Sequence, residues 1–192
     1  MDVSRETLIE RYFPDTDRIK TYADFLAGEG IQRGLIGPRE ADRIWERHIF
    51  NCLPVTQLLK EGSLVFDVGS GAGLPGIVIA LARPDLHVTL IEPLERRVDF
   101  LKEAVAGLNI EVIRGQAQDV RSTAHFVTAR AVAPLEKLKK ITWHLIKTGG
   151  SLMAIKGQSA EEEMKNVAKS ILHEVNLEGI ELGRIIEVRK GA

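Results

Sequence analysis

The spacing of the hydrophobic positions changes near residue 60 of the chain. Before that point, four apolar residues fall on one face of a predicted helix: Ile19, Tyr22, Ala23 and Leu26. We expect this helix to end at Gly28, and a second helix to run from Pro38 to Ile49, because proline suits the first turn of a helix. Residues 1–60 are therefore predicted to form a helical extension.

After residue 60, short apolar runs alternate with amphipathic stretches. The runs are predicted to be strands, at residues 63–69, 86–92, 110–114, 125–130 and 151–156. The stretches that follow them are predicted to contain helices, at residues 74–82, 94–108, 134–147 and 160–173. This alternation is typical of an α/β fold with a doubly wound, mostly parallel, Rossmann-like sheet. We expect residues 61–192 to form one compact domain that binds its ligands beyond the carboxyl ends of the strands.

A glycine-rich loop, DVGSGAGLPG, follows the first predicted strand. Glycines let the backbone turn sharply and approach a ligand closely. The loop formally matches a dinucleotide fingerprint, but Asp67 would repel a pyrophosphate and Pro75 removes one N–H group that would bind it. The pattern D-x-G-x-G is instead typical of enzymes that bind S-adenosylmethionine, which carries an ammonium and a sulfonium but no phosphate. We therefore predict cofactor contacts at three positions of the loop: Asp67, Gly71 and Gly73.

Polar residues follow the other predicted strands. Glu92 ends the second strand, where a carboxylate can accept hydrogen bonds from both ribose hydroxyls. Ala117 and Gln118 follow the third strand, where they are placed to contact the adenine edge, although a plain turn is the alternative. Arg130 ends the fourth strand and Lys156 the fifth, so both are candidates to hold a carboxylate, a phosphate or guanine O6.

Three arginines recur at four-residue spacing in the second N-terminal helix: Arg39, Arg43 and Arg47. That spacing predicts one basic stripe, which together with Trp45 and His48 can contact an RNA backbone and stack on a base. The alternative is an amphipathic helix with ion pairs on its surface and a structural histidine.

Four segments resemble the RsmG (glucose-inhibited division protein B) family, whose members are bacterial small-subunit ribosomal RNA guanine-N7 methyltransferases. They are RGLIGPREADRIWERHIFNC (33–52), DVGSGAGLPGIVIALARPDLHVTLIEPLERRVDFL (67–101), TARAVAPLEKL (128–138) and AIKGQ (154–158). The resemblance implies a class I S-adenosylmethionine-dependent methyltransferase fold. It also implies cofactor contacts at Gly69, Leu74, Ala117, Gln118 and Arg130.

One position and one segment depart from the family pattern. The family commonly has an acidic residue where this chain has Gln118, so we expect its amide or the backbone to make the contact. The closing strand pair of the family is abbreviated here: residues 180–190 are predicted to be the last strand, without a hairpin partner.

Methylation of guanine at N7 is an in-line displacement by a lone pair, so it requires alignment and no general base. We therefore predict no catalytic base; Arg130 and Lys156 are expected to position the substrate, and the basic stripe with His48 to bind RNA. The chain lacks a Pro-Cys nucleophile and an Asn/Asp-Pro-Pro-aromatic run, which other base methylations would favour. Its single cysteine, Cys52, is expected in the core and excludes a multi-cysteine metal site.

The net charge of the chain is -1, which excludes a polycation that coats nucleic acid through bulk charge. The charge is nevertheless uneven: residues 94–140 hold nine Lys and Arg against six Asp and Glu, whereas residues 157–192 hold five against seven. We expect a cytoplasmic monomer that needs no metal or membrane and acts on 16S rRNA within a 30S particle or assembly intermediate. The alternatives are a small-molecule methyltransferase, an NAD-dependent oxidoreductase and a non-catalytic RNA-binding module.

Overall fold

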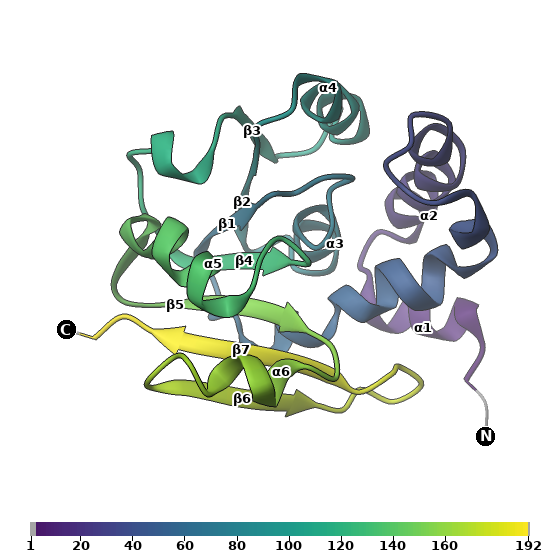
Figure 1. Ribbon diagram of the computed structural model, residues 1–192. Helices are drawn as coiled ribbons and strands as arrows, with labels where there is room; N and C mark the ends of the chain where they lie inside the picture. Colours follow the sequence, from purple (N-terminus) through teal and green to yellow (C-terminus); the bar gives the residue numbers. More distant parts are fainter. Residues whose placement is uncertain (1–2, 192) are drawn as a thin grey trace.

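Figure 1 shows the computed structural model of the chain, which describes residues 3–191. Within these residues, seven strands form one sheet in the order β3-β2-β1-β4-β5-β7-β6. The strands are β1 (Leu64–Val68), β2 (His87–Glu92), β3 (Glu111–Arg114), β4 (Ala124–Arg130), β5 (Ile146–Lys156), β6 (Ser170–Val175) and β7 (Gly183–Arg189). The first five are parallel, and β7 runs antiparallel to both β5 and β6. The predicted doubly wound, mostly parallel sheet is confirmed.

The sheet has a hydrophobic core on each face. One face is covered by α3 (Gly76–Ala82), α4 (Glu95–Ala104) and the N-terminal helices (Figure 1). The other face is covered by α5 (Leu135–Thr142) and α6 (Ala160–Met164). Alternate strand residues supply the two cores: Val65 packs with the first group, whereas Phe66 and Val68 pack with the second.

The N-terminal extension shares the first of these cores. Its α-helices are α1 (Arg5–Tyr12) and α2 (Thr16–Phe25). Tyr22 donates a hydrogen bond to the carbonyl of Ala72 in the glycine loop, at 2.8 Å, and Phe25 stacks on Phe100 of α4 with 4.7 Å between ring centres. The extension is therefore packed directly against the sheet domain.

The irregular helices of this region correct two predictions. The first helix does not end at Gly28, because a π-helical turn, Leu26–Gly30, continues it. The second predicted helix is not a regular α-helix: it tightens into a 3-10 helix at Pro38–Arg43 and widens into a π-helix at Ile44–Ile49. Two further 3-10 turns follow, Phe50–Cys52 and Pro54–Leu58. Because the turn size changes, equal sequence spacing no longer places side chains on one stripe.

The C-terminal segment also differs from the prediction. The expected helix at 160–173 ends at Met164, and β6 begins six residues later. The buried Val167 follows Ala160 and Met164 at helical spacing, which explains the wrong prediction. In the structure, β6 pairs with β7 from Ser170 to Val175, so the closing strand pair that the sequence did not reveal is present.

No helix within residues 3–191 is long and apolar enough to cross a membrane.

Candidate functional site

The glycine loop joins the carboxyl end of β1 to α3. Gly69, Gly71 and Gly73 all have positive φ angles, of 70°, 57° and 96°, which a residue with a Cβ adopts only at a cost. Space is also limited at the first position, because a Cβ on Gly69 would lie 2.8 Å from a methyl group of Val132. These glycines therefore fix the path of the backbone at the edge of the sheet where we expect the cofactor.

Asp67 lies beneath this loop and not in a pocket. Its side chain is fully buried; Oδ2 accepts a hydrogen bond from the Gly76 N–H at 3.1 Å, and Oδ1 accepts one from the Thr128 hydroxyl at 3.2 Å. Burial raises the pKa of Asp67 to about 6, although hydrogen bonds from Ser70, Gly76 and Thr128 oppose the rise. Asp67 thus holds the two ends of the glycine loop together, and its contact with the cofactor stays a prediction.

Glu92 is engaged with the same loop. Its side chain is only 1% exposed, and its two oxygens accept hydrogen bonds from the N–H groups of Gly71 at 2.9 Å and Leu94 at 3.0 Å. Arg97 lies 3.8 Å away and offsets the buried charge. Glu92 thus stands at the predicted edge of the sheet, and its contact with a ribose remains a prediction.

A small apolar pocket of about 190 Å³ opens beside Gly69. It is walled by the ends of β1, β2 and β3 and by α5, through Val68, Gly69, Ile91, Pro93, Gly115, Gln116, Ala117, Gln118, Val132 and Ile141. The structure therefore brings together three residues predicted from sequence, Gly69, Ala117 and Gln118, whereas Leu74 is buried in the core below the loop. Val132, Pro93 and Ile141 were missed, because an isolated apolar residue beside a loop carries no distinctive signal.

A second, larger pocket of about 420 Å³ lies at the ends of β4 and β5. Arg130 and Ala131 line this pocket, and the next residue, Val132, lines the apolar one, so the segment 130–132 separates the two. Asn51, Glu181 and Arg184 also line the larger pocket. None of these three was predicted as a site residue, since they come from segments outside the parallel strands.

Lys156 lines the larger pocket, but its ammonium group is already paired with a carboxylate of the protein. Its Nζ atom lies 2.8 Å from Oε2 of Glu163 and donates to the Ala133 carbonyl, also at 2.8 Å. The side chain is 9% exposed. Lys156 thus ties α6 to the segment that follows β4, and its contact with a substrate phosphate or guanine O6 stays a prediction.

The predicted basic stripe is divided by the irregular helix. Arg43 and Arg47 line one groove, whereas Arg39 is exposed and lines none of the pockets described here. His48 is 15% exposed and lies between two side chains, with Nε2 3.0 Å from Glu40 and Nδ1 3.4 Å from Arg130. Burial, and then the Arg130 charge, lower the pKa of His48. Both ring nitrogens therefore have partners within the protein, and the contact of His48 with RNA stays a prediction.

Cys52 is buried, as expected, and burial raises the pKa of its thiol to about 11. Within residues 3–191, no group of three or more His, Cys, Asp and Glu side chains is arranged to hold a metal ion.

Solved structures with the same fold belong to methyltransferases. A predicted O-methyltransferase from Agrobacterium tumefaciens matches with a TM-score of 0.58 and 19% identity, covering 74% of this chain and 81% of that one. A putative S-adenosyl-L-methionine-dependent methyltransferase from Methanococcus maripaludis matches with a TM-score of 0.57 and 13% identity, covering 90% and 94%. At these identities the likeness establishes the fold alone.

Sequence relatives are much more similar. A protein of Kineococcus radiotolerans called ribosomal RNA small subunit methyltransferase G is 51% identical over 170 residues, covering 85% of this chain and 67% of the relative. A protein of the same name from Mycolicibacterium gilvum is 51% identical over 169 residues, covering 84% and 74%. A family model described as GidB, rRNA small subunit methyltransferase G, matches residues 15–182. The chain therefore belongs to the GidB family of methyltransferases.

Proposed function

We propose that this methyltransferase transfers the methyl group of S-adenosylmethionine to N7 of a guanosine in small-subunit (16S) ribosomal RNA. Family membership supports the class of substrate, because the relatives carry the name of small-subunit rRNA methyltransferases. We further propose that the enzyme acts in the cytoplasm as a monomer, on a 30S particle or an assembly intermediate, because that is where such RNA is presented in folded form.

The observation that carries the proposal is the pair of pockets on either side of segment 130–132. The smaller pocket is apolar and suits the adenine of the cofactor, with Ala117 and Gln118 beside its base edge. Gly69 of the glycine loop stands at the pocket wall beside Val132, which follows β4, the neighbouring strand of β1. The larger pocket, lined by Arg130, then receives the target guanine. A methyl donor and an acceptor base would meet across this segment.

The residues around these pockets fit the cofactor chemically. S-adenosylmethionine supplies an electrophilic methyl group on a positively charged sulfur. The buried carboxylates Asp67 and Glu92 shape the loop from below and make the edge of the sheet acidic, which favours a cationic ligand over a pyrophosphate. Pro75 removes an N–H group at the start of α3, where a phosphate would be bound. The same two features disfavour the NAD-dependent alternative.

For the proposed reaction, the protein must align the methyl group of the cofactor with N7 of guanine and exclude water. N7 of guanine carries no proton, so no base has to remove one. The histidine beside Arg130 agrees with this, because both ring nitrogens of His48 already contact Glu40 and Arg130. Arg130 is the polar group best placed to position the substrate or the carboxylate of the cofactor. Alignment of two bound reactants can lower the barrier by about 7–11 kcal/mol.

The proposal is tested by incubating the purified chain with methyl-labelled S-adenosylmethionine and 30S particles from a bacterium that lacks its own copy of the enzyme. We expect label in the RNA as 7-methylguanosine. Label in a small metabolite added from a cell extract, with none in the RNA, would establish the small-molecule alternative. Calorimetry with S-adenosylhomocysteine and with NADH separates the cofactor classes, and we expect binding of the first alone.

A further inference from the structure

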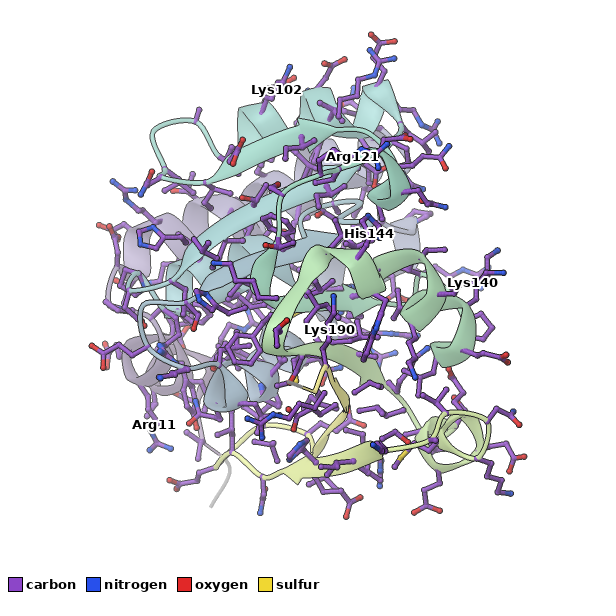
Figure 2. The ribbon with its side chains drawn as sticks, turned by 90° about the vertical axis from the view of Figure 1, so that its left-hand side faces the viewer. Arg11, Lys102, Arg121, Lys140, His144 and Lys190 are labelled. Carbon is purple, nitrogen blue, oxygen red and sulfur yellow. The ribbon has the colours of Figure 1, made fainter. Side chains whose placement is uncertain are left out.

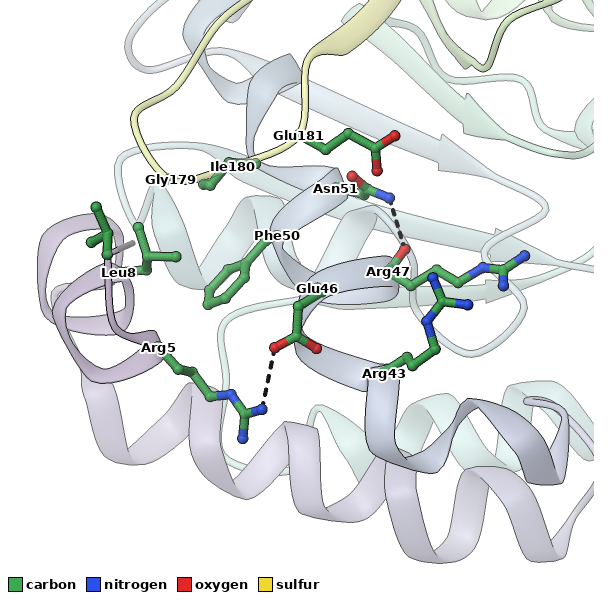
Figure 3. A pocket seen from close by; sticks show the side chains of 11 residues that line it. Arg5, Leu8, Arg43, Glu46, Arg47, Phe50, Asn51, Gly179, Ile180 and Glu181 are labelled. Carbon is green, nitrogen blue, oxygen red and sulfur yellow. Dashed lines mark hydrogen bonds and ion pairs between the residues drawn. The ribbon is translucent and has the colours of Figure 1, made fainter. Parts of the chain in front are cut away.

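A groove of about 700 Å³ lies between α1, the helical segment 43–51 and the loop 179–181 (Figure 3). Leu8, Phe50 and Ile180 form its apolar floor. Charged side chains surround this floor: Arg5, Arg43, Glu46, Arg47 and Glu181. Distant parts of the chain thus combine into one basic and apolar groove that the spacing of the sequence does not reveal.

The positive charges of this groove are only partly neutralised. Arg5 pairs with Glu46 at 3.2 Å, and Arg47 pairs with Glu40 at 3.2 Å. Arg43 has no ion pair within the described residues 3–191 and is exposed. Arg43 and Arg47 extend toward the same side of the groove (Figure 3). An exposed guanidinium without a carboxylate partner, beside a second one, favours an added anion, and guanidinium binds a phosphate through two parallel hydrogen bonds.

The groove adjoins the larger pocket at the ends of β4 and β5. Asn51 and Glu181 line both cavities, so a strand with one base in the pocket beside Arg130 reaches the groove past these two side chains. Asn51 is held in place by a hydrogen bond from its Nδ2 to the Arg47 carbonyl, at 3.1 Å (Figure 3). A base in the pocket therefore has its neighbouring nucleotides at the groove.

We propose that this groove binds the sugar-phosphate backbone of the RNA strand next to the target guanosine, with Arg43 and Arg47 on its phosphates. The proposal rests on the proposed function and specifies where the substrate continues outside the pocket. An RNA strand fits better than an acidic protein segment, because the occupant must be covalently continuous with a nucleotide in the pocket. Arg39, which lies outside the groove, makes no such contact.

The test compares Arg43→Ala with Arg39→Ala, a matched control from the same helical segment. Both side chains are exposed, so neither change disturbs the core. Initial rates of methyl transfer to 30S particles are measured against particle concentration at two salt concentrations. We expect Arg43→Ala to lower kcat/KM about five- to tenfold through KM, and to reduce the salt slope of log kcat/KM by about 1. Arg39→Ala and wild type should agree within about twofold.

Arg47→Lys is a second variant, because it keeps the charge beside Glu40 but loses the two-pronged geometry. We expect a smaller rise in KM than for Arg43→Ala, about threefold. Affinity for S-adenosylhomocysteine should stay unchanged in all three variants. If wild type is active but Arg43→Ala and Arg39→Ala have equal KM values, the groove does not bind the RNA backbone, and the proposed function is unaffected. A wild type that leaves the particles unmethylated would instead overturn the proposed function. If Arg43→Ala bound 30S proteins less well but methylated naked RNA normally, the groove would bind a protein and not RNA.

Discussion

Nη2 of Arg130 lies 3.4 Å from Nδ1 of His48, and this contact determines which ring nitrogen carries the proton. A guanidinium can only donate, so Nδ1 must accept and be unprotonated. The proton is then on Nε2, which donates to Oε2 of Glu40 at 3.0 Å. His48 therefore transmits the charge of Glu40 to Arg130 and fixes the direction of that guanidinium beside the pocket.

The first prediction concerns the pH dependence of this contact. Protonated His48 would direct an N–H group at Arg130, so we expect cofactor or substrate affinity to fall once the pH drops below the pKa of His48 in the folded protein, which is lower than the ordinary histidine value of about 6.5. Because the pKa of His48 is lowered in the folded protein, the unfolded chain binds more protons just below that value. The free energy of unfolding should therefore also fall there with decreasing pH.

The variant His48→Gln separates orientation from simple packing. A glutamine can accept from Arg130 and donate to Glu40 at once, but it does not titrate. We expect it to keep most of the activity near neutral pH and to remove the acidic fall in kcat/KM, whereas His48→Ala lowers kcat/KM at every pH. An acidic fall that survives unchanged in His48→Gln would show that another group titrates.

A second prediction follows from the buried Asp67. Its pKa of about 6 lies above the ordinary value, so the folded protein holds the proton more tightly than the unfolded chain. Its contribution to stability is complete below about pH 4 and is lost as the pH rises through about 6. The free energy of unfolding of Asp67→Asn, relative to wild type, should accordingly rise over that range. Urea titrations at several pH values measure this difference, and a constant difference would refute it.

The third prediction compares two glycines with positive φ. Gly62 (68°) has open space around it, whereas a Cβ on Gly73 (96°) would overlap Ile77 and lie 3.0 Å from the Tyr22 hydroxyl. We expect Gly62→Ala to cost about 1–2 kcal/mol of unfolding free energy from backbone strain alone. Gly73→Ala should cost about 1–3 kcal/mol more and weaken S-adenosylhomocysteine binding as well. Equal losses from thermal or urea unfolding would mean that the loop adapts freely.

A fourth prediction separates two roles for Lys156. If it holds the segment after β4 through Glu163 and Ala133, then Lys156→Gln and Glu163→Gln should lower kcat/KM by similar factors. The double variant should lose little more than either single one, because the two residues share one interaction of about 1–3 kcal/mol. If Lys156 contacts RNA directly, Glu163→Gln would leave the rate intact or raise it, and only Lys156→Gln would be impaired.

The regular part of the fold could be predicted because each buried parallel strand is a short apolar run followed by a recognisable helix. The glycine loop and Arg130 were placed correctly at strand ends for the same reason. The closing pair was not predicted, since β6 is an edge strand whose Ile171 is exposed and extends a helical spacing. The apolar spacing of this segment favours a helix, but its pairing with β7 makes it a strand.

The side-chain roles were harder to predict. A charged residue at a strand end was expected to contact a ligand, but Asp67, Glu92 and Lys156 all make buried contacts within the protein. Partners such as Glu40 and Glu163 decide those roles, and they are brought near only by the fold. Two side chains labelled in Figure 2 also make contacts within the protein: Nε2 of His144 lies 3.1 Å from the carbonyl oxygen of Ala117, and Nζ of Lys190 donates to the carbonyl of Trp143 at 2.9 Å.

A map of methylated nucleosides in 16S rRNA from cells with and without this chain tests N7 methylation of guanosine in the cell. We expect a single 7-methylguanosine that disappears with the gene and returns with wild type, but returns only weakly with Arg130→Ala. An identical map in both strains, or a change in a nucleoside other than 7-methylguanosine, would contradict it.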